Sequence, residues 1–214
     1  MELIGYDVSR IVYLTNFVRR EGSGYLPEIA QRVIQTYSFL KSPSADDLQK
    51  DAQTFAMGKF QGIQINELSV YGDGIIVSGR CSTQTLQDFI ADLFAMMTKD
   101  FGYIETRVLE PEMHYESSLI VRSGKALDSV IAPPQRVTTT IEQTLRAQTR
   151  AEYRPIGFNF ETDVSGLGTR RRPVRFSLER RLGVPFSKNV FYSQAPITSA
   201  DHLALLEKLE QIAD

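Results

Sequence analysis

The segment 63–102 constrains the fold of this chain more than any other. Two apolar runs in "GIQINELSVYGDGIIVSG" flank a Gly-Asp-Gly turn, and Asp-Gly is favoured where both turn residues need positive φ, so the segment predicts a β-hairpin. The apolar residues change parity between Ile65 and Leu68, which predicts a bulge near residues 66–67. At least part of the chain is therefore an antiparallel sheet.

An amphipathic helix is predicted directly after this hairpin. Ser82 is a favourable N-cap, and Gly102 stands where a left-handed C-cap belongs. Between them, large apolar residues recur with helical spacing at Leu86, Phe89, Ile90, Leu93, Phe94, Met96 and Met97. A hairpin followed by a helix with one long apolar face predicts a helix packed on an antiparallel sheet.

The remaining segments continue the alternation of strands and helices. Their patterns predict strands over 7–18, 156–160, 174–178 and 189–194, extended chain over 103–122, and helices over 27–40, 125–132, 136–153 and 198–213. We therefore expect an α+β fold in which helices pack on one face of antiparallel sheet, arranged as two β-α lobes. The lobes would be residues 1–107 and 108–214, or the chain would be one continuous domain. Both halves end in strands followed by a helix, but no sequence repeat of motif quality is present.

Several classes of protein are excluded by simple features of the 214-residue chain. A single cysteine, Cys81, rules out an internal disulfide framework and any CxxC metal site, and favours a reduced, cytoplasmic protein. The first residues, "MELIGYDVSR", carry acids where a signal peptide needs positive charge. No run of about eighteen apolar residues occurs, so we expect a soluble protein that does not span a membrane.

The charges are unevenly distributed. Residues 136–182 hold ten arginines, no lysine and five acids, a net charge of +5. Because the whole chain carries −2, the remainder carries −7. The planar guanidinium group binds carboxylate or phosphate in a bidentate manner, so this region suits an anionic ligand, an acidic protein partner or another copy of the chain.

The most basic stretch is "GLGTRRRPVRF", residues 166–176, which connects two amphipathic strands. Its glycines lead into a strand and not into a helix, so the phosphate-loop and dinucleotide-binding patterns do not apply. We predict an anion-binding or partner-binding hairpin loop, whose residues are Arg170, Arg171, Arg172 and Arg175. The alternative is a solvated loop that pairs with its own neighbours, Glu161 and Asp163.

Catalytic and metal-binding patterns are weak. Every second residue of one segment is a possible metal ligand, namely Glu110, Glu112, His114 and Glu116. An extended backbone would place all four on one face, where they could ligate a metal, but an exposed edge strand explains the same pattern.

Cys81 lies close enough to a helix N-terminus for its pKa to be lowered, but a buried structural cysteine is the favoured interpretation. No serine-nucleophile elbow is present. We expect neither a cofactor nor enzymatic activity.

The apolar residues suggest an interaction surface. The helix predicted after Ser82 has a long face rich in Phe and Met, and five further phenylalanines lie in the second half of the chain. Together they exceed what one small sheet can bury. The five are Phe158, Phe160, Phe176, Phe186 and Phe191. The leading hypothesis is a non-catalytic protein–protein interaction or assembly module, either a homo-oligomer or a subunit of a complex. The alternative is a nucleic-acid or phosphate binder that uses the arginine-rich loop. The third hypothesis is a metal-dependent enzyme.

Overall fold

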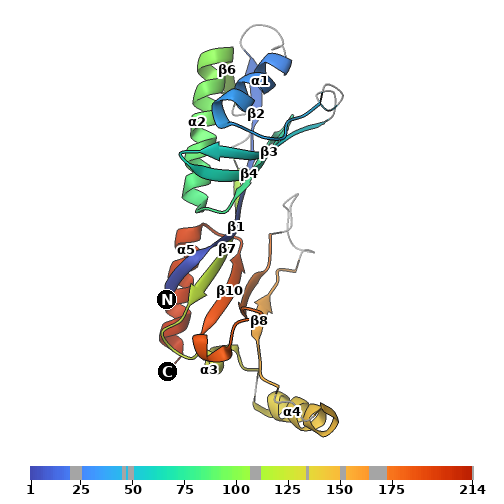
Figure 1. Ribbon diagram of the computed structural model, residues 1–214, viewed down its shortest axis with the longest axis vertical. Coiled ribbons are helices and arrows are strands. Elements are labelled where there is room, and N and C mark those ends of the chain that lie inside the picture. Colours follow the sequence, from blue (N-terminus) through green and yellow to red (C-terminus); the bar gives the residue numbers. More distant parts are fainter. Residues whose placement is uncertain are drawn as a thin grey trace. The chain divides into compact units, whose positions relative to one another are not determined.

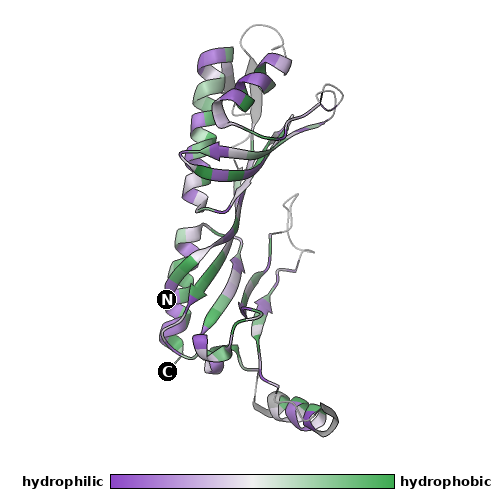
Figure 2. Ribbon diagram, viewed as in Figure 1, coloured by the Kyte–Doolittle hydropathy of each residue, from purple (hydrophilic) through white to green (hydrophobic). Residues whose placement is uncertain are grey.

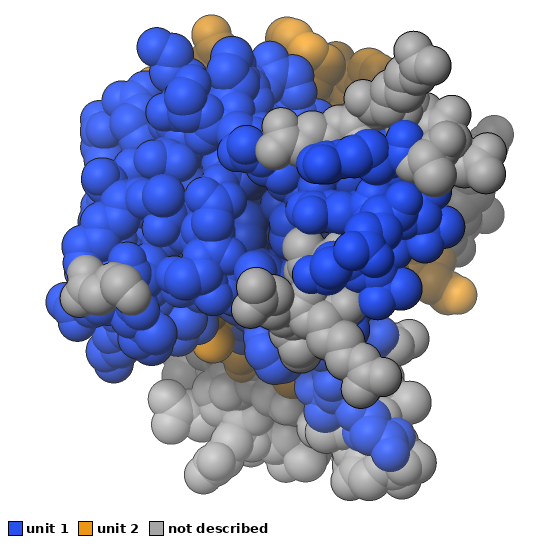
Figure 3. Space-filling view, turned by 90° about the horizontal axis from the view of Figure 1, so that it is seen from below, with its two compact units in different colours: residues 1–5, 118–196, 200–214 blue, residues 6–117, 197–199 orange. Residues whose placement is uncertain are grey.

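A computed structural model describes residues 1–19, 26–44, 47, 51–106, 112–133, 135–149, 153–163 and 173–213. The chain divides into two compact units, coloured separately in Figure 3. Unit 1 comprises residues 1–5, 118–196 and 200–214, and unit 2 comprises residues 6–117 and 197–199. The division at 107/108 expected from the sequence stays a prediction.

An eight-stranded antiparallel sheet confirms the predicted α+β fold (Figure 1). The strand order is β3-β4-β5-β1-β7-β10-β9-β8. Its strands are β1 (Glu2–Leu14), β3 (Ala52–Phe60), β4 (Ile63–Tyr71), β5 (Gly74–Gly79), β7 (Glu112–Arg122), β8 (Gly157–Phe160), β9 (Phe176–Arg180) and β10 (Val190–Ala195). A second, two-stranded sheet pairs β2 (Asn16–Arg19) with β6 (Tyr103–Thr106). The helices are α1 (Leu26–Tyr37), α2 (Thr83–Phe101), α3 (Asp128–Ile131), α4 (Gln135–Thr149) and α5 (Ser199–Ile212).

The predicted hairpin and helix of unit 2 are confirmed in detail. β4 and β5 pair antiparallel, with a register shift between Ile65 and Glu67 where the parity change predicted a bulge. The Ser82 hydroxyl accepts a hydrogen bond from the Thr85 amide at 3.1 Å, and Gly102 closes α2 in the left-handed conformation with φ of 64°. Hydrophobic and polar residues alternate along α2 in Figure 2, as expected for a helix with one buried face.

The turn of this hairpin differs from the prediction. Tyr71 pairs with Gly74, so the two turn residues are Gly72 and Asp73, and neither has positive φ. Gly74 is required for another reason, because a Cβ at this position would collide with the backbone carbonyl oxygen of Tyr13 on β1. The glycine therefore permits close pairing of β5 with β1 and does not form the turn.

The core of unit 2 lies between the sheet and the two helices α1 and α2. The Tyr37 ring of α1 packs edge-on against Phe89 of α2, with 4.8 Å between ring centroids. Its hydroxyl donates to Asp92 at 2.8 Å, and burial together with this carboxylate raises the pKa of Tyr37. The buried apolar residues that surround this contact include Ala30, Val33, Phe55, Phe60, Ile65, Leu68, Val77, Leu86, Ile90 and Leu93.

Unit 1 contains a strand, a helical segment, three strands and a final helix in that order, and unit 2 contains the same series with β2 added before α1 and β6 added after α2. The strands β8, β9 and β10 pair antiparallel in that order, and β10 is adjacent to β7 in the sheet. Figure 2 shows hydrophobic residues along β7 and β10. The buried apolar residues of this unit are Leu119, Val121, Leu127, Ile131, Leu178, Val190, Phe191, Ala195, Leu206 and Ala213.

Candidate interaction surface

Unit 1 has an apolar groove of about 910 Å³. It is lined by Phe158, Phe160 and Phe176 on β8 and β9 and by Leu205 and Leu209 on α5. Further lining comes from residues 130–133 at the end of α3, from Ile141 and Glu142 of α4, and from residues 153–157 before β8. The lining is almost entirely apolar, which is typical of a surface that receives another hydrophobic element.

The groove residues are unusually exposed for their type. Phe160 is 65% exposed, Ile156 49%, Ile141 48% and Tyr153 40%. Single exposed apolar side chains are common on protein surfaces, but here they line the same groove. Phe160 is one of the five phenylalanines that, from the sequence, exceed what one small sheet can bury, and it is exposed in this groove.

Helix α4 leaves part of its apolar face exposed. Val137, Ile141 and Leu145 follow one another at intervals of four residues and share one face, as the sequence predicted. Val137 is 46% exposed and Ile141 48%, whereas α1, the corresponding helix of unit 2, buries Val33 to 4% and Tyr37 to 2%. Two helices with similar sequence patterns therefore differ in what covers them.

One wall of the groove is positioned by Arg180 of β9. The guanidinium donates to Asp128 of α3 at 2.8 Å and to the Phe186 carbonyl at 3.1 Å. It also lies over the rings of Phe186 and Phe191, at 4.6 and 5.1 Å from their centroids. Because Arg180 is only 5% exposed, these contacts hold α3 against the sheet and so place Ile131 at the groove.

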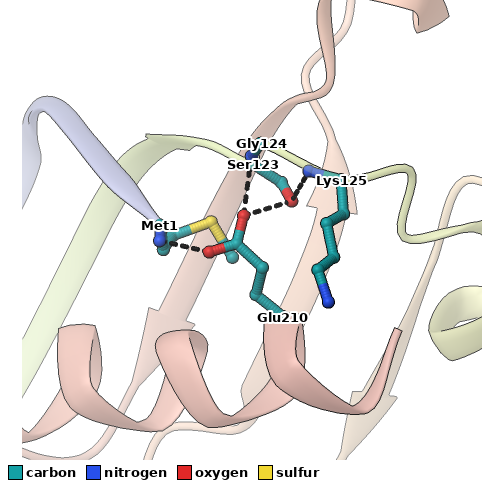
Figure 4. A network of polar contacts seen from close by, with 5 residues as sticks. All are labelled: Met1, Ser123, Gly124, Lys125 and Glu210. Carbon is teal, nitrogen blue, oxygen red and sulfur yellow. Dashed lines mark hydrogen bonds and ion pairs between the residues drawn. The ribbon is translucent and has the colours of Figure 1, made fainter. Parts of the chain in front are cut away.

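A polar network holds the end of α5 to the neighbouring loop (Figure 4). The Glu210 carboxylate accepts hydrogen bonds from the Met1 amino group, from the Ser123 hydroxyl at 2.7 Å and from the Gly124 amide at 2.6 Å. Burial raises the pKa of this carboxyl group, but the three donors outweigh burial and lower the pKa of Glu210 to about 2. The network lies one residue beyond Leu209 and fixes the part of α5 that lines the groove.

A serine–histidine pair in unit 1 resembles a catalytic pair only in its distance. Ser193 Oγ lies 2.8 Å from His202 Nε2, and both residues have no exposed surface. The Ser193 hydroxyl donates to the Ser177 carbonyl at 2.6 Å, so its proton is directed away from the imidazole. A buried serine that donates to a backbone carbonyl is not positioned as a nucleophile, and the pair links β10 to α5.

Cys81 differs from the sequence-based expectation about its acidity. The thiol is 4% exposed, and burial raises the pKa of Cys81 to about 11. Its position before α2 left a lowered pKa open, but desolvation by burial dominates at this site. The favoured interpretation, a buried structural cysteine, agrees with this environment.

The other predicted site residues lie partly outside the described residues. Arg170, Arg171, Arg172 and Glu110 fall in undescribed segments, whereas Arg175 is described and exposed. His114 and Glu116 are half-buried on β7. Within the described ranges, no three His, Cys, Asp or Glu residues gather as a metal site. The arginine-loop and metal hypotheses both stay predictions.

Comparisons with known proteins place the fold only loosely. No family model matches the chain, and no curated protein sequence matches it. A solved structure described as "Methanococcus jannaschii TBP" is similar with a TM-score of 0.47 and 11% sequence identity, covering 99% of this chain and 97% of that one. Nothing about function follows from a likeness at this level. No helix among the described residues is long and apolar enough to cross a membrane.

Proposed function

We propose that this chain is a non-catalytic protein–protein interaction or assembly module that self-associates through the groove of unit 1. The observation that carries the proposal is the groove itself, whose exposed residues Phe160, Ile156 and Tyr153 line one apolar surface. Apolar surface of this kind gains free energy when a partner removes it from water. The buried Ser193–His202 pair and the unreactive environment of Cys81 argue against the nucleophilic chemistry that the sequence left open.

Self-association is tested by light scattering over a wide range of protein concentration. The wild-type chain is expected to form a dimer or larger assembly, and Phe160→Glu is expected to weaken it, because an anchor residue contributes at least about 2 kcal/mol, or roughly thirtyfold in affinity. Leu182→Glu is the matched control, since Leu182 is 87% exposed in the same unit but does not line the groove. A strict monomer, or equal effects of the two variants, contradicts the proposal.

The uneven charge favours a second candidate function, the binding of an anionic partner by Arg170, Arg171, Arg172 and Arg175. It is supported by the net charge of +5 over residues 136–182 against −7 in the remainder. Replacing the first three arginines by alanine should weaken binding to duplex DNA or RNA and flatten its dependence on salt. If the wild-type chain binds no nucleic acid at low salt, nucleic-acid binding by this loop is ruled out.

A further inference from the structure

Unit 2 contains a cavity of about 680 Å³ that the proposed function does not use. Residues of the helices α1 and α2 and of the strands β3, β4 and β5 line it. Its volume is within the range of small-molecule sites in proteins, roughly 300–1,000 Å³. We propose that this cavity binds a small amphipathic molecule that has an apolar body and a positively charged amino group. The inference concerns unit 2 alone and does not depend on self-association through the groove of unit 1.

The buried part of the cavity lining is apolar. It includes Val33 of α1, Phe55 of β3, Leu68 of β4 and Leu93 of α2, which all belong to the core of the unit. The walls are therefore held in place by the packing of the core and do not depend on a ligand. An apolar body gains free energy in such a site because its surface is removed from water.

Acidic residues of the lining are grouped at one end of the cavity. Ala52 pairs with Tyr71 in the register of β3 and β4, so Asp51, the residue before Ala52, lies beside the turn residues Gly72 and Asp73. Asp51, Gly72 and Asp73 are exposed, so this end of the cavity faces solvent. A ligand can therefore place its polar group here while its body reaches the buried residues.

The charge at this end favours a cation. The described lining residues include two carboxylates, those of Asp51 and Asp73, and no Lys, Arg or His. Carboxylates form charge-assisted hydrogen bonds with an ammonium group, and the rings of Tyr71 and Tyr103, which also line the cavity, attract a cation over their faces. Residues 6–117 as a whole hold fifteen acids against ten lysines and arginines, a net charge of −5, which attracts cations and repels anions.

Three probes that share one apolar body test the inference: phenylbutylamine, phenylbutanol and phenylbutyrate. Binding is followed by NMR of the full chain labelled at its methionine methyl groups, because Met97 lines the cavity whereas Met57, which is 43% exposed, does not. Titration with the amine should shift the Met97 resonance and leave that of Met57 in place. The amine should bind at least about tenfold more tightly than the carboxylate, with the alcohol between them, and added salt should reduce the difference.

Paired variants separate the two carboxylates from the general charge of the unit. Asp51→Asn combined with Asp73→Asn should weaken binding of the amine roughly fivefold, the scale of two exposed ion pairs, and leave binding of the alcohol unchanged. The matched control is Glu28→Gln combined with Asp88→Asn, which removes the same charge from exposed positions of α1 and α2 outside the lining. This control should bind the amine like the wild type.

Two further variants fill the cavity. Ile29→Trp and Val70→Phe each enlarge a half-buried residue of the lining, and a variant that keeps the wild-type urea midpoint should bind every probe at least about tenfold more weakly. The inference is wrong if no probe shifts the Met97 resonance, if the three probes bind equally, or if the two charge variants have equal effects. None of these outcomes changes the light-scattering result for unit 1, so the proposed function is tested separately.

Discussion

The hydroxyl groups of Thr83 and Ser199 each accept a hydrogen bond at the start of the other residue's helix. Thr83 is the first residue of α2 and Ser199 the first residue of α5, and both belong to unit 2. The Thr83 amide donates to Ser199 Oγ at 3.0 Å, and the Ser199 amide donates to Thr83 Oγ1 at 2.9 Å. Thr83 is 2% and Ser199 6% exposed, so water cannot replace either acceptor.

Thr83→Val and Ser199→Ala each remove one acceptor and leave one buried amide without a partner. The cost of such an amide is about 1–3 kcal/mol, and loss of a helix cap costs about 0.5–2 kcal/mol, so each variant should lose about 1–2 kcal/mol of unfolding free energy. For a chain of this size that corresponds to a fall in Tm of about 2–4 °C per kcal/mol. Urea unfolding followed by circular dichroism measures the loss directly.

The double variant tests whether the two hydrogen bonds act together. If losing one bond lets the segments separate, the second bond is weakened as well, and the double variant costs less than the two single variants combined by at least about 0.5 kcal/mol. The control is Gln84→Ala, because Gln84 is exposed and its side chain donates to Asp88 one turn away, so a change within about 0.5 kcal/mol is expected. Single variants as stable as the wild type would refute the reasoning, and strict additivity would refute the coupling.

Three further predictions concern single sites. Folding lowers the pKa of Glu210, so its carboxylate stabilises the fold above the unfolded pKa of about 4.3, and this contribution is lost as the pH falls toward 2. In Glu210→Gln the urea midpoint should therefore depend less on pH between about pH 5 and 2 than it does in the wild type. The Cys81 thiol, with its pKa raised to about 11, should react with a thiol reagent at pH 8 roughly two orders of magnitude more slowly than in urea, and rapid reaction in the folded chain would contradict its burial. Gly74→Ala forces a Cβ against the Tyr13 carbonyl and should cost about 1–3 kcal/mol, whereas Gly5→Ala, with open space around it, should change the urea midpoint little.

Local features of the fold were predictable because they depend on neighbours in sequence. The bulge between Ile65 and Glu67 follows from a parity change, and both caps of α2, Ser82 and Gly102, follow from side-chain chemistry within one turn. The hydrogen bonds between Thr83 and Ser199 join residues 116 positions apart, and no periodicity signals them. The similar order of elements in the two units was indicated by the sequence, because both halves end in strands followed by a helix.

The excess of phenylalanines indicated an interaction surface, but the position of the groove could not be predicted. Periodicity states which face of an element is apolar but not what covers that face, so α1 and α4 give the same sequence signal although Tyr37 is buried and Ile141 is half exposed.

The strand residues Phe158 and Phe160 show the same limit, since alternation places both on one face of the strand without stating what covers that face, and Phe160 is largely exposed. An apolar face that the fold leaves exposed favours binding of a partner, because removing that surface from water lowers the free energy, as burial of the core does on folding. On unit 1 the groove, with Ile141 of α4 in its lining, is such a face. This is why we propose self-association, which would remove that surface from water.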